Sequence, residues 1–127
     1  MSTALKDETK RFRDGTHRVV DPAVTLARVM PLAPRMGITR VAVLTGLDTI
    51  GIPVAAAIRP NSRSIAQHQG KGATLDAAKA SAVMEAAETW HAESVALFER
   101  TLADCERLLP GDHPMTQAIR ENLQAAT

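Results

Sequence analysis

The chain has 127 residues and 45% apolar residues, enough for one modest domain whose core must be aliphatic because aromatic residues make up only 2%. A single cysteine, Cys105, excludes an intrachain disulfide, and we expect it to be a small core residue on a helix. The chain shows neither a signal-peptide core nor the run of about 20 apolar residues that spans a membrane, so a cytoplasmic protein without a membrane partner is expected.

The two halves of the chain carry opposite net charge. Residues 1–72 contain 11 Lys/Arg and 5 Asp/Glu, for a net charge of +6, and residues 73–127 contain 4 and 9, for a net charge of −5. This favours either halves that attract each other within a fold or a basic half that binds a nucleotide or an acidic peptide. Nucleic acid is not an expected partner, because no aromatic stacking residues interleave with the basic ones.

The first half predicts a helix followed by two strands. Residues 1–17 are polar and charged and predict a flexible N-terminal arm. Asp21-Pro22 then predicts a helix start, with an aspartate cap before a proline in the first turn, and Gly37 predicts its end beyond two further prolines. Residues 38–45 and 52–59 read as an antiparallel strand pair joined by a turn that contains glycine and aspartate.

The second half predicts helices. Residues 60–72 read as a long polar loop of the kind that often carries function. A helix is expected to begin at Thr74 as its cap and to continue to a break at residues 110–114, with a last helix over about 115–126. Four residues at helical spacing predict the buried stripe of the long helix: Ala77, Ala80, Met84 and Ala87.

The run Gly70-Lys71-Gly72 before this helix, and the side chains of Ser81, Glu85 and Glu88 on it, form the candidate site. Glycines allow close approach of the backbone to a phosphate, and free N–H groups at a helix start favour anions. Two carboxylates one turn apart are suitable ligands for Mg²⁺. The alternative is a solvated acidic face, which is what most glutamate pairs at this spacing are. No P-loop is present, because Gly72 stands where that motif needs Ser or Thr.

Several runs in the right order resemble the YcaO family over about residues 10–93. They are Gly-Thr-His-Arg (15–18), Gly-Ile-Thr-Arg-Val-Ala (37–42), Thr-Gly-Leu-Asp (45–48), Gly-Ile-Pro-Val (51–54), Arg-Pro-Asn-Ser-Arg-Ser (59–64), Gln-Gly-Lys-Gly-Ala-Thr (69–74) and Ala-Ser-Ala-Val-Met-Glu-Ala-Ala-Glu (80–88). The resemblance implies an enzyme that uses ATP to activate a peptide backbone amide, as in a cyclodehydratase, for azoline formation or thioamidation of ribosomal peptides.

The resemblance also implies roles for individual residues. Glu85 and Glu88 would ligate the Mg²⁺ that bridges the ATP phosphates. Ser81 would sit beside them, and Lys71 would shape the entry to the helix near the phosphates. Two further nucleotide contacts would come from the first segment, at Arg18 and Thr25. ATP and Mg²⁺ are therefore the implied cofactors, and no catalytic residue is assigned.

Residues 92–127 resemble a single tetratricopeptide repeat, on the run Ala-Leu-Phe-Glu-Arg-Thr-Leu-Ala-Asp-Cys-Glu-Arg-Leu-Leu (96–109) and on Asp-His-Pro-Met-Thr (112–116). The expected fold class is α+β, with a β-hairpin or small antiparallel sheet and flanking helices as a partial YcaO fold, followed by a C-terminal helical hairpin. The expected domains are the flexible arm 1–17, a partial YcaO-like domain 18–93 and the repeat 94–127.

Two classes of function follow. The first is a truncated YcaO-like protein, ancestrally binding ATP–Mg²⁺ and inactive alone, since a complete member of the family is roughly three times as long. The second is a non-catalytic helical interaction module, with a gene remnant as a third reading. The expected partners are a peptide substrate, a complementary YcaO half, or a second copy through the C-terminal helices, since one repeat cannot bury its apolar face alone.

Overall fold

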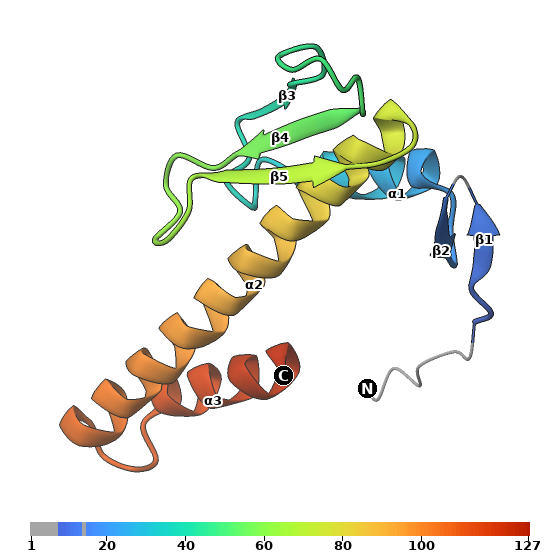
Figure 1. The fold of residues 1–127 in the computed structure, drawn as a ribbon. Coiled ribbons are helices and arrows are strands. Elements are labelled where there is room, and N and C mark those ends of the chain that lie inside the picture. The colour runs from blue at the N-terminus through green and yellow to red at the C-terminus, as the bar shows by residue number, and fades with distance from the viewer. Residues whose placement is uncertain (1–7, 14) are drawn as a thin grey trace. The chain divides into compact units, whose positions relative to one another are not determined.

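The computed structural model describes residues 8–13 and 15–127 (Figure 1). The chain divides into two compact units, one that ends at Ala86 and one formed by Ala87–Thr127. Helix α2 (Leu75–Leu108) is continuous and contributes residues to both. The expected α+β class is confirmed, with small antiparallel sheets, flanking helices and a C-terminal pair of helices.

A β-hairpin opens the described part of the chain. Strands β1 (Arg11–Arg13) and β2 (Thr16–Arg18) pair antiparallel, where we expected a flexible arm through residue 17. Gly15 lies in the turn at φ 81°, a conformation that glycine adopts without steric cost. The rings of Phe12 and His17, directly opposite each other, meet edge to face at 5.3 Å between centroids. The strand pairing and this cross-strand ring contact order a segment for which the sequence, from its charges, predicts a flexible arm. Residues 8–10 precede β1 without regular secondary structure and are exposed, and residues 1–7 and 14 of the expected arm lie outside the described residues.

Helix α1 (Pro22–Val29) begins where the sequence predicts. The Asp21 carboxylate accepts a hydrogen bond from the backbone N–H of Ala23 at 3.1 Å, and Pro22 occupies the first turn. A 3₁₀ turn, η1 (Met30–Leu32), follows because Pro31 within it and Pro34 after it have no backbone N–H to continue the α-helical hydrogen bonds. The turn region ends at Gly37, whose φ of 73° terminates it as expected.

The central sheet has the order β3-β4-β5, with both pairs antiparallel. The expected strand pair is confirmed as β3 (Arg40–Val43) and β4 (Val54–Ile58). The third strand, β5 (Gln67–Lys71), was not expected, because we took residues 60–72 as a loop. Its inward positions hold His68 and Gly70, so the alternation of buried and exposed residues produces no apolar pattern.

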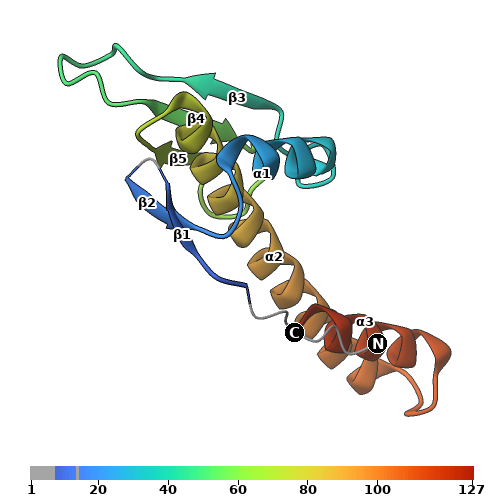
Figure 2. The same cartoon turned by 90° about the vertical axis from the view of Figure 1, so that its right-hand side faces the viewer.

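Helix α1 and the first turns of α2 lie on the same side of this sheet (Figures 1 and 2). The core between these layers is built mainly from alanines, which permit close approach. Its members in α2 are Ala77, Ala78, Ala80, Ala82, Val83 and Ala86, and β4 adds Ala55 and Ala57, which pair with the inward Gly70 and His68. Ala56 is buried on the other face of the sheet. The expected stripe is right at Ala77 and Ala80, only half-buried at Ala87 and wrong at Met84, which is exposed. Because small side chains let neighbouring elements pack closely around this part of α2, more than one face of the helix is buried. The buried residues therefore do not form a single stripe with a 3.6-residue period.

In the second unit, α3 (Pro114–Ala126) returns beside the end of α2, and the expected helical pair is confirmed. The Nδ1 atom of His113 caps α3 by accepting from the N–H of Met115 at 3.2 Å. Arg120 and Glu106 form an ion pair between the helices at 2.7 Å. Cys105 is buried, as predicted. Within the described part of the chain, no helix combines the length and hydropathy needed to span a bilayer.

Candidate functional site

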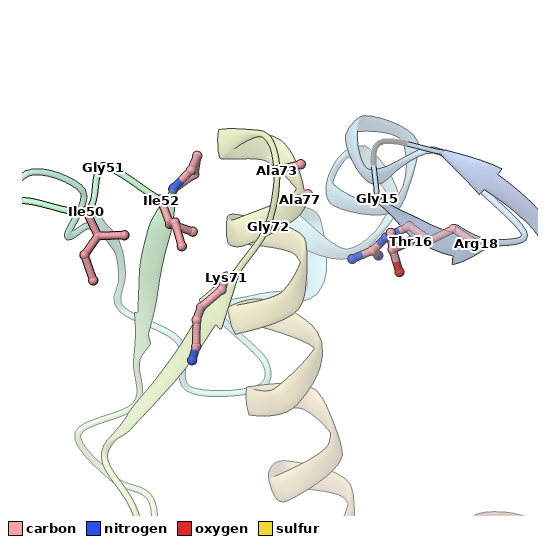
Figure 3. A pocket seen from close by; sticks show the side chains of 11 residues that line it. Gly15, Thr16, Arg18, Ile50, Gly51, Ile52, Lys71, Gly72, Ala73 and Ala77 are labelled. Carbon is pink, nitrogen blue, oxygen red and sulfur yellow. The ribbon is translucent and has the colours of Figure 1, made fainter.

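An open pocket of about 700 Å³ lies at the N-terminal end of α2, within the first unit (Figure 3). Four segments far apart in the sequence meet there: the hairpin, the β3–β4 loop, the end of β5 and the start of the helix. The lining residues are Gly15, Thr16, Arg18, Ile50, Gly51, Ile52, Pro53, Lys71, Gly72, Ala73 and Ala77. Residues 71–73 of the candidate run therefore open onto a cavity, although most of the lining comes from other segments.

The β3–β4 loop forms the apolar wall of this pocket. The carboxylate of Asp48 accepts hydrogen bonds from the backbone N–H groups of Ile50, at 3.0 Å, and Gly51, at 3.3 Å. This turn, with Gly51 at φ 74°, holds the side chains of Ile50 and Ile52 exposed rather than packed in the core. Exposed aliphatic side chains beside a cavity suit a ligand that has an apolar part.

A cation and a helix terminus make the pocket attractive to anions. The guanidinium of Arg18 is turned toward α2, whereas the side chain of Lys71 extends from the outward face of β5, away from α2 (Figure 3). In the described part of the chain, the Nε atom of Arg18 is shielded from solvent without a hydrogen-bond partner. Thr74 caps the helix by accepting from the N–H of Ala77 at 3.2 Å. The positive end of the helix dipole and the guanidinium of Arg18 therefore act in the same region.

Close packing against α2 explains Gly70 and Gly72, the two glycines for which the sequence predicts a phosphate-binding role. A Cβ atom on Gly70 would lie 2.2 Å from the carbonyl oxygen of Ala78 and 2.2 Å from the backbone nitrogen of Ala82. One on Gly72 would lie 2.5 Å from the Cβ of Ala77. Gly70 also belongs to strand β5 rather than to a turn. The expectation of a glycine turn for phosphate is corrected: these glycines let β5 and its end approach α2.

The acidic side chains follow the same face of α2 that begins at the pocket. Ser81 and Glu85 come four and eight residues after Ala77, which at 1.5 Å per residue is about 6 and 12 Å further along the helix. Ser81 is half-buried, and the Glu85 side chain is 55% exposed. Glu88, also exposed, follows three residues later in the second unit. Thr25, Ser81 and Glu85 do not line the pocket.

Thr25 is engaged within its own helix. Its hydroxyl donates to the backbone carbonyl oxygen of Asp21 at 3.3 Å, and the side chain is half-buried. Threonine in the first turn commonly makes such a local bond. Of the two residues expected from the first segment, the structure thus places Arg18 at the pocket and leaves Thr25 bonded to the start of α1.

Sequence reasoning missed a buried histidine beside Glu85. His68 is 1% exposed, and its Nδ1 atom lies 3.9 Å from the Oε1 atom of Glu85. No role follows for His68 from the sequence, because it lacks zinc-ligand spacing and because a histidine in the loop predicted over residues 60–72 has no fixed face. Among the described residues, no three His, Cys, Asp or Glu side chains converge as a set that could hold a metal ion.

The model of the YcaO cyclodehydratase family, described as ATP- and Mg²⁺-binding, matches residues 69–124 of this chain. This part of the chain is YcaO-like. The match begins in β5, includes Lys71, Ser81, Glu85 and Glu88, and continues through α3, over residues that we compared with a tetratricopeptide repeat. The hairpin and α1, which carry Arg18 and Thr25, lie outside it.

Uncharacterized proteins from bacteria and an archaeon are similar over most of the chain. One from Mycobacterium tuberculosis is 45% identical over 106 residues, which are 82% of this chain and 24% of that protein. One in the tfuA 3′ region of Rhizobium leguminosarum bv. trifolii is 45% identical over 121 residues, 95% of this chain and 25% of that protein. One from Methanothermobacter thermautotrophicus is 41% identical over 98 residues, 73% of this chain and 26% of that protein. The chain thus spans about a quarter of the length of these relatives.

Among solved structures, YcaO from Methanopyrus kandleri bound with AMPPCP and Mg²⁺ is similar at 30% identity, with a TM-score of 0.48. The likeness covers 60% of this chain and 21% of that one.

Proposed function

We propose that this chain carries part of an ATP–Mg²⁺ site of the YcaO type. The observation that carries the proposal is the face of α2 on which Ser81, Glu85 and Glu88 follow one another, within the segment that matches the ATP- and Mg²⁺-binding family model. An exposed acidic pair alone would be read as a solvated surface. The family match, and the pocket towards the same end of the helix, favour metal binding by this acidic pair over a merely solvated surface.

Glu85 and Glu88 are the proposed magnesium ligands. On a continuous helix, side chains three residues apart are neighbours, so both carboxylates can reach one cation. Mg²⁺ is commonly held by one or two carboxylates together with substrate phosphates and water, which agrees with the lack of a third acidic or histidine ligand in the described part of the chain. A bound dication would also remove the repulsion between the two carboxylates.

The pocket is the proposed place for one end of the nucleotide. Arg18 supplies positive charge, and Lys71 would add a second if its side chain turned from the outward face of β5 toward the pocket that the residue lines. Ser81 lies between the pocket and Glu85 along the helix. The exposed Ile50 and Ile52 offer an apolar surface for the nucleoside. Thr25 stays a proposed nucleotide contact from the family resemblance, and it would have to release the carbonyl oxygen of Asp21 to serve as one.

In the proposed reaction, ATP activates a peptide backbone amide for azoline or thioamide formation. Because the chain spans about a quarter of its relatives, we propose that it does not turn over peptide on its own and that a complementary YcaO part supplies the remaining ligands. Positioning and electrostatic stabilisation both need the other side of such a cleft.

A helical interaction module is the second candidate. Leu97, Leu108 and Met115 in the second unit are exposed apolar side chains. This surface suits self-association or a partner helix, as expected for a single tetratricopeptide-like pair.

Calorimetric titration with ATP and Mg²⁺ separates the two candidates. The wild-type chain should bind saturably and only with Mg²⁺, and Glu85→Gln/Glu88→Gln should weaken binding by at least about tenfold. Glu99→Gln, at an exposed position further along the same helix, is the matched control and should bind like wild type. Absent binding, or equal binding by the double variant, contradicts the proposal. Absent binding together with concentration-dependent sedimentation supports the interaction module.

A further inference from the structure

His68 occupies a position in β5 that is closed to solvent. The strand alternates between exposed and buried residues, and both buried ones, His68 and Gly70, are on its inward side. Gly70 touches the backbone of α2 at Ala78 and Ala82, which fixes that inward side as the one facing the helix. The imidazole therefore lies between the sheet and α2, with its ring held by packing.

The two ring nitrogens of His68 have different surroundings. Nδ1 is 3.9 Å from Oε1 of Glu85, and Nε2 is buried without a hydrogen-bond partner among the described residues. Burying a polar atom without a partner costs free energy, so this histidine needs a reason beyond filling space. Its nearby carboxylate is one of the two that we assign to magnesium.

We propose that His68 is a positioning residue for Glu85, an inference that rests on the proposed function. The Nδ1 atom lies 3.9 Å from Oε1 of Glu85, just beyond hydrogen-bonding distance, and with a proton on Nδ1 a small movement of the Glu85 side chain would close the gap. In that arrangement, the imidazole would donate to one carboxylate oxygen and so fix the orientation in which the carboxylate meets Mg²⁺. Carboxylates that bind metals are commonly held by such a second partner, and its loss typically weakens metal affinity 10–100-fold.

Two variants separate positioning from packing. His68→Asn keeps an N–H donor close to the position of Nδ1, whereas His68→Leu fills the space without a donor. We expect His68→Leu to keep a cooperative melt and to weaken Mg²⁺-dependent ATP binding by about tenfold. His68→Asn should recover most of the affinity, even though it fills less of the space and is expected to be the less stable of the two.

The inference is overturned if His68→Leu binds ATP with Mg²⁺ as tightly as the wild-type chain does. It is also overturned if the affinities of both variants simply follow their melting temperatures. In either case, the proposed function stands as long as wild-type binding still depends on Glu85. If the wild-type chain does not bind ATP with Mg²⁺, the inference and the proposed function are both overturned.

A second readout does not depend on turnover. Titration with Mg²⁺ and ATP should shift the imidazole ¹⁵N resonances of His68 in the wild-type chain and leave them in place in Glu85→Gln. Resonances that do not move in the wild-type chain while the ligand binds overturn the inference.

Discussion

Gly70→Ala tests the contact between β5 and α2 on which the first unit depends. The added Cβ would lie 2.2 Å from two backbone atoms of the helix, whereas ordinary contacts begin at 3.4 Å, so strand and helix would have to separate by about 1.2 Å. Over-packing of this kind costs about 1–3 kcal/mol, and the upper end applies because backbone atoms cannot rotate away. At about 4–8 °C per kcal/mol, the melting temperature of this unit should fall by roughly 12–24 °C.

Circular dichroism melts and amide exchange in β4 and β5 provide the assay. Gly111→Ala is the matched control, because a Cβ there meets nothing within 4 Å. It should change stability by less than about 1 kcal/mol. A melting temperature for Gly70→Ala within about 2 °C of wild type would refute the close approach of strand and helix described here.

Three further substitutions test single contacts. Thr74→Ala removes the cap on the N–H of Ala77 and should cost about 1 kcal/mol in a denaturant titration, while Thr74→Ser should cost less; equal losses would exclude the cap as the cause. Arg120→Ala breaks a half-exposed ion pair and should lower stability by less than about 1 kcal/mol, so a larger loss in the melt would show that the pair is worth more than its exposure indicates. Arg18→Ala should weaken Mg²⁺–ATP binding by about tenfold in calorimetry without a change in the melt of α2, and unchanged affinity would remove Arg18 from the nucleotide site.

The elements that carry local signals were predictable from sequence. Asp21-Pro22 places the start of α1, and Thr74 places the start of α2, because each side chain caps the backbone groups predicted for it. The β3–β4 pair followed from its aliphatic runs and the turn between them. The early hairpin was missed although Asp14-Gly15 is a dipeptide typical of two-residue turns, since the charges around it outweighed that signal.

The contacts made by β5 were not predictable from sequence alone. Its inward residues are a histidine and a glycine, so neither alternation of apolar residues nor β-branched composition marks a strand. In the sequence, Gly70 and Gly72 could serve either close approach to a phosphate or close packing against a helix. Only the position of α2 in the structure distinguishes the two. The placement of His68 beside Glu85 depends on the same contact.

Paramagnetic broadening by Mn²⁺–ATP tests most directly whether the carboxylates of α2 hold a nucleotide-bound metal. With Mn²⁺ in place of Mg²⁺, the amide resonances of residues 81–88 should broaden first, and Glu85→Gln/Glu88→Gln should abolish the effect. Broadening centred on another acidic stretch, such as Asp104 and Glu106, or broadening that persists in the double variant, would contradict the account.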